Sequence, residues 1–338
     1  MKPSTISRRD FSGSLAAAAA AAGSLANPQP TEAAPMAPTD IPIIDTHIHL
    51  FDPTRPEGIP WPPKDNAVLY KTALPDRFRK IAVPLGIRGA IEVECSTVVE
   101  DNQWVLDIAA KDTIIVGTIG NLEPGTPVFQ AQLNRFRRNP LFRGIRYGNL
   151  WDRSLARDGG KPAVVADLKA LADAGLVMDT ANPDADLIAG LVRLTDRIPG
   201  LRVVLDHLPK LTPPQQATAL AAYKANLREL GKRPQIFVKV SAVLRPIAGQ
   251  IPENLDAYRD RLDEIWDIFG ENRVIYGSDW PNSDTVGEYP KVLAVVREYF
   301  TGKGQAAAEK YFWKNSVAAY GWIKRENGQP VLGRAEGE

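Results

Sequence analysis

Cysteine, histidine, charge of one sign and long apolar runs are all scarce in this chain of 338 residues. The single cysteine, Cys95, excludes a disulfide within the chain. The formal net charge is +1 and no strongly basic or acidic block occurs, so nothing indicates nucleic acid or an anionic membrane as a partner. Beyond the N-terminal region no apolar run is long enough to span a bilayer, and we expect no stable membrane anchor.

The N-terminal region is similar to a twin-arginine export signal. Arg8, Arg9 and Phe11 precede a weakly apolar, Ala-rich run over residues 15–25. We therefore expect residues 1–38 to be a signal peptide with a Pro/Ala-rich linker, and the protein to be periplasmic or secreted. The lack of disulfides fits a protein that folds before export. The alternative is an Ala-rich amphipathic or disordered tail.

The segment 43–49 is typical of a buried strand, with apolar residues between polar ones. Residues two apart in a strand point to the same face, so we expect Asp45, His47 and His49 to share one. Two imidazoles so placed can converge on one metal ion or one polarised oxygen. The alternative is a pair of core histidines, but this strand holds two of the three histidines in the chain.

Strand-like and helix-like segments alternate through the rest of the chain. The predicted strands are 43–49, 89–94, 114–122, 143–148, 176–181, 202–208, 235–241 and 273–279. The predicted helices are 101–111, 128–138, 163–174, 185–198, 214–230, 255–269, 289–300 and 305–322.

Eight strands in strict alternation with helices predict an α/β fold of the (β/α)8 TIM-barrel type. We expect a single barrel domain over residues 39–325 and a C-terminal tail over 326–338. An open doubly wound sheet is the alternative, but no Gly-rich phosphate loop follows any strand. The long Pro-rich loop 51–70 follows the first strand and is expected to serve the mouth of an active site.

Charged residues at the ends of apolar strands are the candidate functional groups, because a buried charge needs a partner. In a TIM barrel the chemistry gathers where the strands end. Function is favoured for His207 and Asp279, each near the end of an apolar strand. Structural and functional roles are weighed evenly for Glu92, Arg146 and Lys239, and a purely structural ion pair between Glu94 and Arg146 remains open.

Several motifs resemble the amidohydrolase superfamily, namely its amidohydrolase-2 family and the lactonase-like group within it. They are the Asp-x-His-x-His of residues 45–49, Asp206-His207 and the Gly-Ser-Asp-Trp-Pro of 277–281. The segments 142–147 and 238–241 are also similar to the corresponding sequences of that group. Its members include L-fuconolactone, L-rhamnonolactone and 2-pyrone-4,6-dicarboxylate hydrolases, so the resemblance implies lactone hydrolysis and carbohydrate metabolism.

The resemblance also implies roles for residues. Asp279 would be the general base, and His207 would stabilise the oxyanion or protonate the leaving alkoxide. The cofactor would be one divalent ion, Zn²⁺ or similar, or none, held by His47, His49 and Asp279 with His207 as a fourth ligand or a supporting donor. Two-metal relatives carry a lysine on strand four and a histidine on strand five, which this chain lacks there, so a two-metal site is excluded.

The partner would be a small-molecule lactone, and the chain a monomer or homo-oligomer. Arginine and lysine can bind carboxylate or hydroxyl groups, and aromatic rings can stack on a sugar. The expected substrate-binding residues are Arg146, Lys239, Glu94, Trp280 and Tyr147, with Trp151 as a further ring. A metal-dependent decarboxylase of the same family and a non-catalytic sugar-binding barrel are the rival functions. The first would release carbon dioxide, and the second would need no catalytic acid.

Export is testable at the arginine pair. Replacing Arg8 and Arg9 together with lysine should leave the protein in the cytoplasm, because the twin-arginine route requires the pair. Cell fractionation and immunoblotting measure the distribution. Normal export of the twin-lysine variant would remove the basis for this localisation.

Overall fold

The computed structural model describes residues 41–332 of the chain. The predicted export signal lies outside these residues, as does the end of the predicted C-terminal tail. Within 41–332, no helix combines the length and the hydrophobicity of a membrane span.

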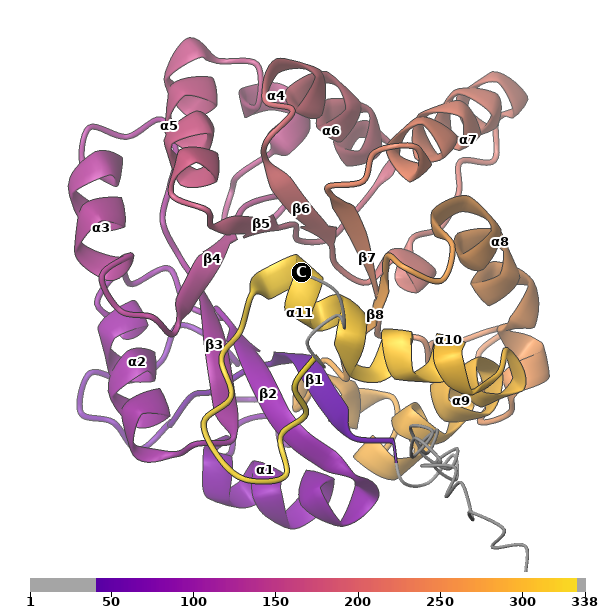
Figure 1. Cartoon of the computed structure of the whole chain (residues 1–338), viewed down its shortest axis with the longest axis horizontal. Coiled ribbons are helices and arrows are strands. Elements are labelled where there is room, and N and C mark those ends of the chain that lie inside the picture. The colour runs from indigo at the N-terminus through magenta and orange to yellow at the C-terminus, as the bar shows by residue number, and fades with distance from the viewer. Residues whose placement is uncertain (1–40, 333–338) are drawn as a thin grey trace, which may run out of the picture. The chain divides into compact units, whose positions relative to one another are not determined.

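Eight parallel strands follow one another in sequence order around a barrel (Figure 1). They are β1 (Ile43–Ile48), β2 (Ile87–Val93), β3 (Ile115–Gly120), β4 (Phe142–Arg146), β5 (Val177–Asp179), β6 (Arg202–Leu205), β7 (Ile236–Val240) and β8 (Val274–Tyr276). The barrel closes just beyond β8, where the Asp279 N–H donates to the His47 carbonyl at 2.9 Å and the His49 N–H to the Trp280 carbonyl at 2.8 Å. The predicted (β/α)8 barrel is confirmed.

Helices surround the strands (Figure 1). They are α1 (Pro75–Ala82), α2 (Asp101–Lys111), α3 (Phe129–Phe136), α4 (Leu155–Asp158), α5 (Pro162–Asp173), α6 (Ala185–Arg197), α7 (Ala217–Gly231), α8 (Arg259–Phe269), α9 (Tyr289–Gly302), α10 (Gln305–Glu309) and α11 (Asn315–Tyr320). Short 3₁₀ turns occur at Val83–Leu85, Leu208–Lys210, Leu255–Ala257 and Asn282–Thr285, and a π-helical turn, Lys310–Lys314, joins α10 to α11.

Local sequence explains these helices and the departures from prediction. In α6, the Asp184 carboxylate accepts a hydrogen bond from the Leu187 N–H, and leucines at helical spacing face the core. The helix predicted from residue 214 begins at Ala217, because Gln216 caps it through the Ala219 N–H. The predicted helix 305–322 is interrupted by the π-helical turn, and α1 and α4 were not predicted.

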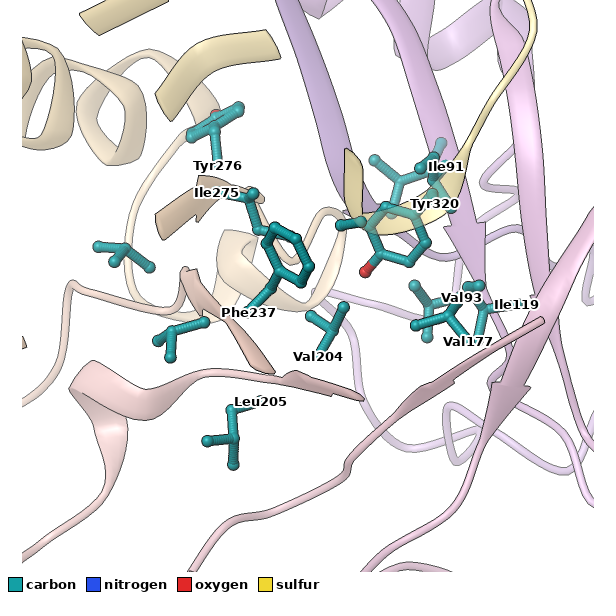
Figure 2. Packing of buried hydrophobic residues seen from close by; sticks show 14 of the residues in the cluster. Ile91, Val93, Ile119, Val177, Val204, Leu205, Phe237, Ile275, Tyr276 and Tyr320 are labelled. Atoms are coloured by element: carbon teal, nitrogen blue, oxygen red, sulfur yellow. The ribbon is translucent and has the colours of Figure 1, made fainter. Parts of the chain in front are cut away.

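The barrel interior is apolar except for a few buried charges. Figure 2 shows part of this core, with Tyr320 of α11 among side chains from β2, β3, β6 and β7. The Tyr320 hydroxyl donates to Asp179 Oδ2 at 2.9 Å, and Lys239 Nζ lies 5.5 Å from the centre of the Tyr320 ring. The nearby Asn315 amide donates to the Val274 carbonyl at the start of β8. α11 therefore supports the buried charges from the amino-terminal end of the strands.

Part of the segment predicted as a tail packs against the barrel. Gln329 is buried and its amide donates to the Thr113 carbonyl at 2.9 Å, while Glu326 pairs with Arg79 at 3.0 Å. The chain between α11 and residue 329 thus packs over the start of β3.

Loss of the Tyr320 hydroxyl should destabilise the barrel. Tyr320→Phe leaves Asp179 with one hydrogen bond fewer in a fully buried place, which costs about 1–3 kcal/mol of unfolding free energy. Urea denaturation measures it. Tyr299→Phe is the matched control, because its hydroxyl donates at 2.7 Å to Asp263, a half-exposed carboxylate that keeps Lys303 as a partner. Equal losses in the two variants would contradict a special role for Tyr320.

Candidate functional site

Three histidines and one aspartate converge at the carboxyl ends of the strands. His47 and His49 lie at the end of β1, His207 follows β6, and Asp279 follows β8. Asp279 Oδ1 lies 3.6 Å from Nε2 of His47, 3.3 Å from Nε2 of His49 and 3.7 Å from Nε2 of His207. All the histidines of the chain therefore aim one nitrogen at the same carboxylate oxygen.

The backbone is bent sharply at two of these residues. His207 has φ 52° and Asp279 has φ 65°, both in the left-handed region that side chains other than glycine seldom adopt. Such conformations cost of order 1–3 kcal/mol and cluster at functional sites. Each turn comes directly after a strand, so it reorients the side chain across the barrel mouth.

Gly277, two residues before Asp279, leaves space for the side chains of the site. A Cβ on Gly277 would lie 2.8 Å from His47 Cβ and 3.0 Å from Lys239 Cδ, closer than packed side chains allow. The close packing holds His47 between the backbone of β8 and the Lys239 side chain.

Asp45 does not join the two histidines, contrary to the expectation from strand alternation. Its carboxylate accepts hydrogen bonds from the Ser278 N–H at 2.9 Å and from the Tyr289 hydroxyl of α9 at 2.8 Å. The register of β1 against β2 shifts between Asp45 and Ile48, which interrupts the two-residue alternation. Asp45 therefore ties β1 to the loop after β8 and to a surrounding helix.

The tautomer of His49 follows from its backbone contact. Nδ1 of His49 lies 2.7 Å from the Val93 carbonyl, which can only accept, so Nδ1 carries the proton. The Nε2 lone pair then faces Asp279 Oδ1 across 3.3 Å. Two acceptors at this distance repel each other unless a proton or a cation lies between them.

The donor set fits a single metal ion. Atoms of His47, His207 and Asp279 lie within 4.8 Å of one another, and His49 Nε2 adds a fourth donor beside Asp279. Tetrahedral zinc with bonds of about 2.0–2.1 Å places its ligand atoms roughly 3.4 Å apart, close to the observed separations. Among the described residues, His47 Nε2 and Asp279 Oδ1 are buried without a hydrogen-bond partner. The geometry thus makes His207 as good a ligand as His49.

A buried charge network lies beneath the histidines. Lys239 Nζ lies 2.8 Å from Asp179 Oδ2, 2.9 Å from Asp206 Oδ1 and 3.2 Å from His47 Nδ1. Arg146 Nε lies 3.4 Å from Asp206 Oδ2. These residues lie on β1, β4, β5 and β7 and just after β6. Since these strands are not all neighbours, the side chains meet inside the barrel.

The network sets the protonation of the site. Burial and the Lys239 ammonium hold the pKa of His47 well below its usual range, and burial lowers that of His207 to about 4. Burial alone would raise the pKa of Asp279, but His207 and the other histidines outweigh it and keep that pKa low. At neutral pH the site therefore presents the neutral imidazoles of His47 and His207 and the carboxylate of Asp279, the forms that bind metals.

A cavity opens onto this group from the solvent side. It offers about 200 Å³ to the centres of water-sized atoms. Its lining residues come from the end of β4 and from the segments that follow the strands: His49, Trp61, Cys95, Arg146, Leu150, Trp151, Asn182, His207, Lys210, Asp279 and Asn282. A small molecule in this cavity would lie against Asp279.

Comparison with known proteins identifies the family. The Amidohydrolase family model matches residues 44–322, which include all the barrel strands except the first residue of β1. The chain belongs to the amidohydrolase family. It is 27% identical to an L-fucono-1,5-lactonase from Burkholderia ambifaria over 248 residues, covering 73% of this chain and 82% of the relative.

Two further relatives come from Burkholderia multivorans. One is an L-fucono-1,5-lactonase, 26% identical over 288 residues, covering 81% of this chain and 94% of the relative. The other is a crystal structure of an amidohydrolase with bound Zn, with a TM-score of 0.72, 22% identity and coverage of 83% of this chain and 100% of that one. This likeness shows that the family fold is shared.

The structure distributes the expected substrate-binding residues unevenly. Arg146 and Trp151 line the cavity. Glu94 instead lines a neighbouring cavity and accepts a hydrogen bond from the Trp151 indole N–H at 3.2 Å.

Three other expected contacts lie outside the cavity lining. Lys239 is fully buried and pairs with Asp179 and Asp206, and Tyr147 is also buried. Trp280 is fully buried against Phe78, at 5.3 Å between ring centres. Packing explains these corrections, because the three side chains are buried in the fold and do not reach the cavity.

Sequence reasoning missed the amidohydrolase residues Trp61 and Asn282. The Trp61 ring packs edge-on to His49 at 5.5 Å, and the Asn282 amide donates to Asp279 Oδ2 at 2.8 Å. The placement of the loop 51–70 at the mouth is confirmed, and its tryptophan between prolines was the available signal. Asn282 follows the Gly-Ser-Asp-Trp-Pro motif and carried no signal of its own.

Proposed function

We propose that this protein is a hydrolase that opens a lactone, a cyclic ester of a sugar acid or of a carboxylated ring, with Asp279 as the general base. The proposal rests on the free carboxylate oxygen of Asp279. Oδ2 accepts from Asn282, whereas Oδ1 is without a hydrogen-bond donor among the described residues and faces the three imidazoles. A carboxylate held ionised, with one oxygen free at a cavity, is suited to take a proton from water.

The reaction follows from these positions. Water gives a proton to Asp279 Oδ1 while its oxygen bonds to the lactone carbonyl carbon. The ring carbon–oxygen bond then breaks, and the leaving alkoxide takes the proton that Asp279 received from water, which restores the base. His207 lies beside Asp279 and would stabilise the oxyanion. The hydrogen bond between His207 Nδ1 and Ser241 Oγ at 2.8 Å orients that ring. Arg146, at the cavity wall, can bind a substrate oxygen.

The residues that would hold a divalent ion are His47, His207 and Asp279, with His49 beside them. A bound Zn²⁺ or similar ion would polarise the carbonyl and acidify water. The Lys239 and Asp206 groups under His47 fix the orientation of its ring by contacts to Nδ1.

Two rival functions receive less support. Decarboxylation occurs in the same family, but the two relatives named above that carry the name of an activity are both lactonases. A sugar-binding barrel without catalysis would have no use for a buried carboxylate with a free oxygen. The product separates the rivals, because lactone opening yields an acid without loss of carbon dioxide.

Asp279→Asn tests the base directly. The change keeps the shape and removes the basic oxygen, so turnover of the best lactone from a sugar-lactone screen should fall by about 10²–10⁴-fold. Thermal unfolding should stay near that of the wild type, because the Asn282 contact and the backbone bonds can persist. Lactonase rates and unfolding are measured on the same preparation.

The matched control for this variant is Asp284→Asn. Asp284 lies in the same turn but pairs with Arg77 at 3.1 Å and lines no part of the cavity. Its turnover should remain at the wild-type level. A folded Asp279→Asn protein with near wild-type turnover would refute the base assignment, and a wild type that opens no lactone would refute the function.

Metal content gives an independent test of the site. The chain has three histidines, and all of them surround one oxygen, so elemental analysis should find one equivalent of Zn or a similar ion, or less. After dialysis against a chelator, adding back one equivalent should raise the unfolding temperature, because binding stabilises the folded state. Two equivalents, both required for turnover, would contradict a single site.

A further inference from the structure

A second, smaller cavity lies beside the reaction cavity. Trp61 and Cys95 line both of them, and the Glu94–Trp151 hydrogen bond joins a wall of one to a wall of the other. The side cavity offers about 20 Å³ to the centres of water-sized atoms. A single water needs roughly 10–15 Å³ of such volume, so one or two heavy atoms fit.

The inner wall of the side cavity carries carboxyl oxygens without donors. Glu92 is 2% exposed and lines the cavity, and no hydrogen bond or ion pair reaches its carboxyl group within residues 41–332. Glu94 Oε1 is buried and also lacks a partner there. Burial, and then the charge of Glu94, raise the pKa of Glu92 well above its usual range. Buried acceptors of this kind require a donor.

The other polar groups of the wall already have partners. The Asn102 amide donates to the Asn121 carbonyl at 3.0 Å, and the Asn121 amide donates to the Ser96 carbonyl at 2.6 Å. Arg55 pairs with Asp101 at 2.7 Å and lies over the Trp104 ring at 4.4 Å. The cavity therefore contains its own cation, and the group that is missing is a neutral donor.

The remaining surface of the side cavity is apolar. Phe51, Ile59, Pro60, Trp61 and Trp104 contribute rings and alkyl groups to the lining. Aromatic and alkyl surface opposite hydrogen-bond acceptors matches a group with carbon–hydrogen faces and a hydroxyl at its end. A short hydroxylated carbon arm combines these properties at the size that fits.

We propose that this side cavity is the subsite for an exocyclic hydroxymethyl arm of the substrate, whose hydroxyl donates to Glu92. The inference rests on the proposed lactone hydrolysis and extends it, because the arm would pass Trp61 while the ring lies at Asp279. Glu92 then selects among lactones without touching the reacting atoms, and water fills the subsite when the arm is absent.

Two lactones and three variants test the subsite. The lactones are 1,5-lactones with the same ring, one with a hydroxymethyl group and one with a methyl group at the ring carbon next to the ring oxygen. The ratio of their kcat/KM values should favour hydroxymethyl in the wild type. Glu92→Leu removes both acceptors and should lower that ratio by about 3- to 10-fold, the value of a hydrogen bond between neutral groups. Glu92→Gln keeps one acceptor, so its ratio of kcat/KM values should lie between those of the wild type and Glu92→Leu.

The matched control is Asp167→Asn. Asp167 is a buried carboxylate of α5 that accepts from the Gly125 N–H and the Gln130 amide, and it lines neither cavity. The ratio should not change in this variant. Thermal unfolding of Glu92→Leu should be no lower than that of the wild type, because the replaced carboxyl has no protein donor to lose. If Glu92→Leu does not fold, the kcat/KM ratio of Glu92→Gln replaces it as the test of the subsite.

The outcomes separate the subsite from the function. If the wild type opens both lactones and the ratio is the same in Glu92→Leu, only water occupies the side cavity and the subsite proposal is wrong. If a methyl arm is preferred in the wild type, the proposal is also wrong. If the wild type opens neither lactone nor any other in the screen, the proposed function fails, and the subsite falls with it.

Discussion

The ammonium group of Lys239 is the constraint on which the barrel interior depends. A charge with no exposure to solvent must be matched within a few ångströms, and two aspartates from neighbouring strands do this. Asp206 is shared with Arg146 and His47, and Asp179 with Tyr320. The position of His47 is thus fixed from below by charge balance, and the strained turns at His207 and Asp279 complete the candidate site from above.

The architecture was predictable because its signals are local. Apolar strands and amphipathic helices alternate at spacings that permit few folds, and all eight predicted strands occur in the barrel. Helix ends were less predictable, since the start of α7 depends on a capping glutamine and the π-helical turn before α11 depends on packing. The order of the strands required no long-range information, because each parallel strand lies next to its successor.

The site was predictable as a set of residues and less so as a geometry. His47, His49, His207 and Asp279 meet as expected, because the ends of barrel strands share one mouth. The orientation of Asp45 could not be predicted, since it depends on a register shift between β1 and β2. Trp280 was expected at the substrate and is buried against Phe78, because the turn after β8 decides which side chain faces the mouth.

The contact between Tyr320 and Asp179 has a consequence for synthesis of the chain. It joins one of the last residues of the barrel to a strand near its middle, so the charges under His47 reach their final balance only after almost the entire chain has left the ribosome. Early strands can pair with their neighbours as they emerge, but the buried charge network is completed last. Completion of the candidate site and completion of the polypeptide are therefore nearly the same event.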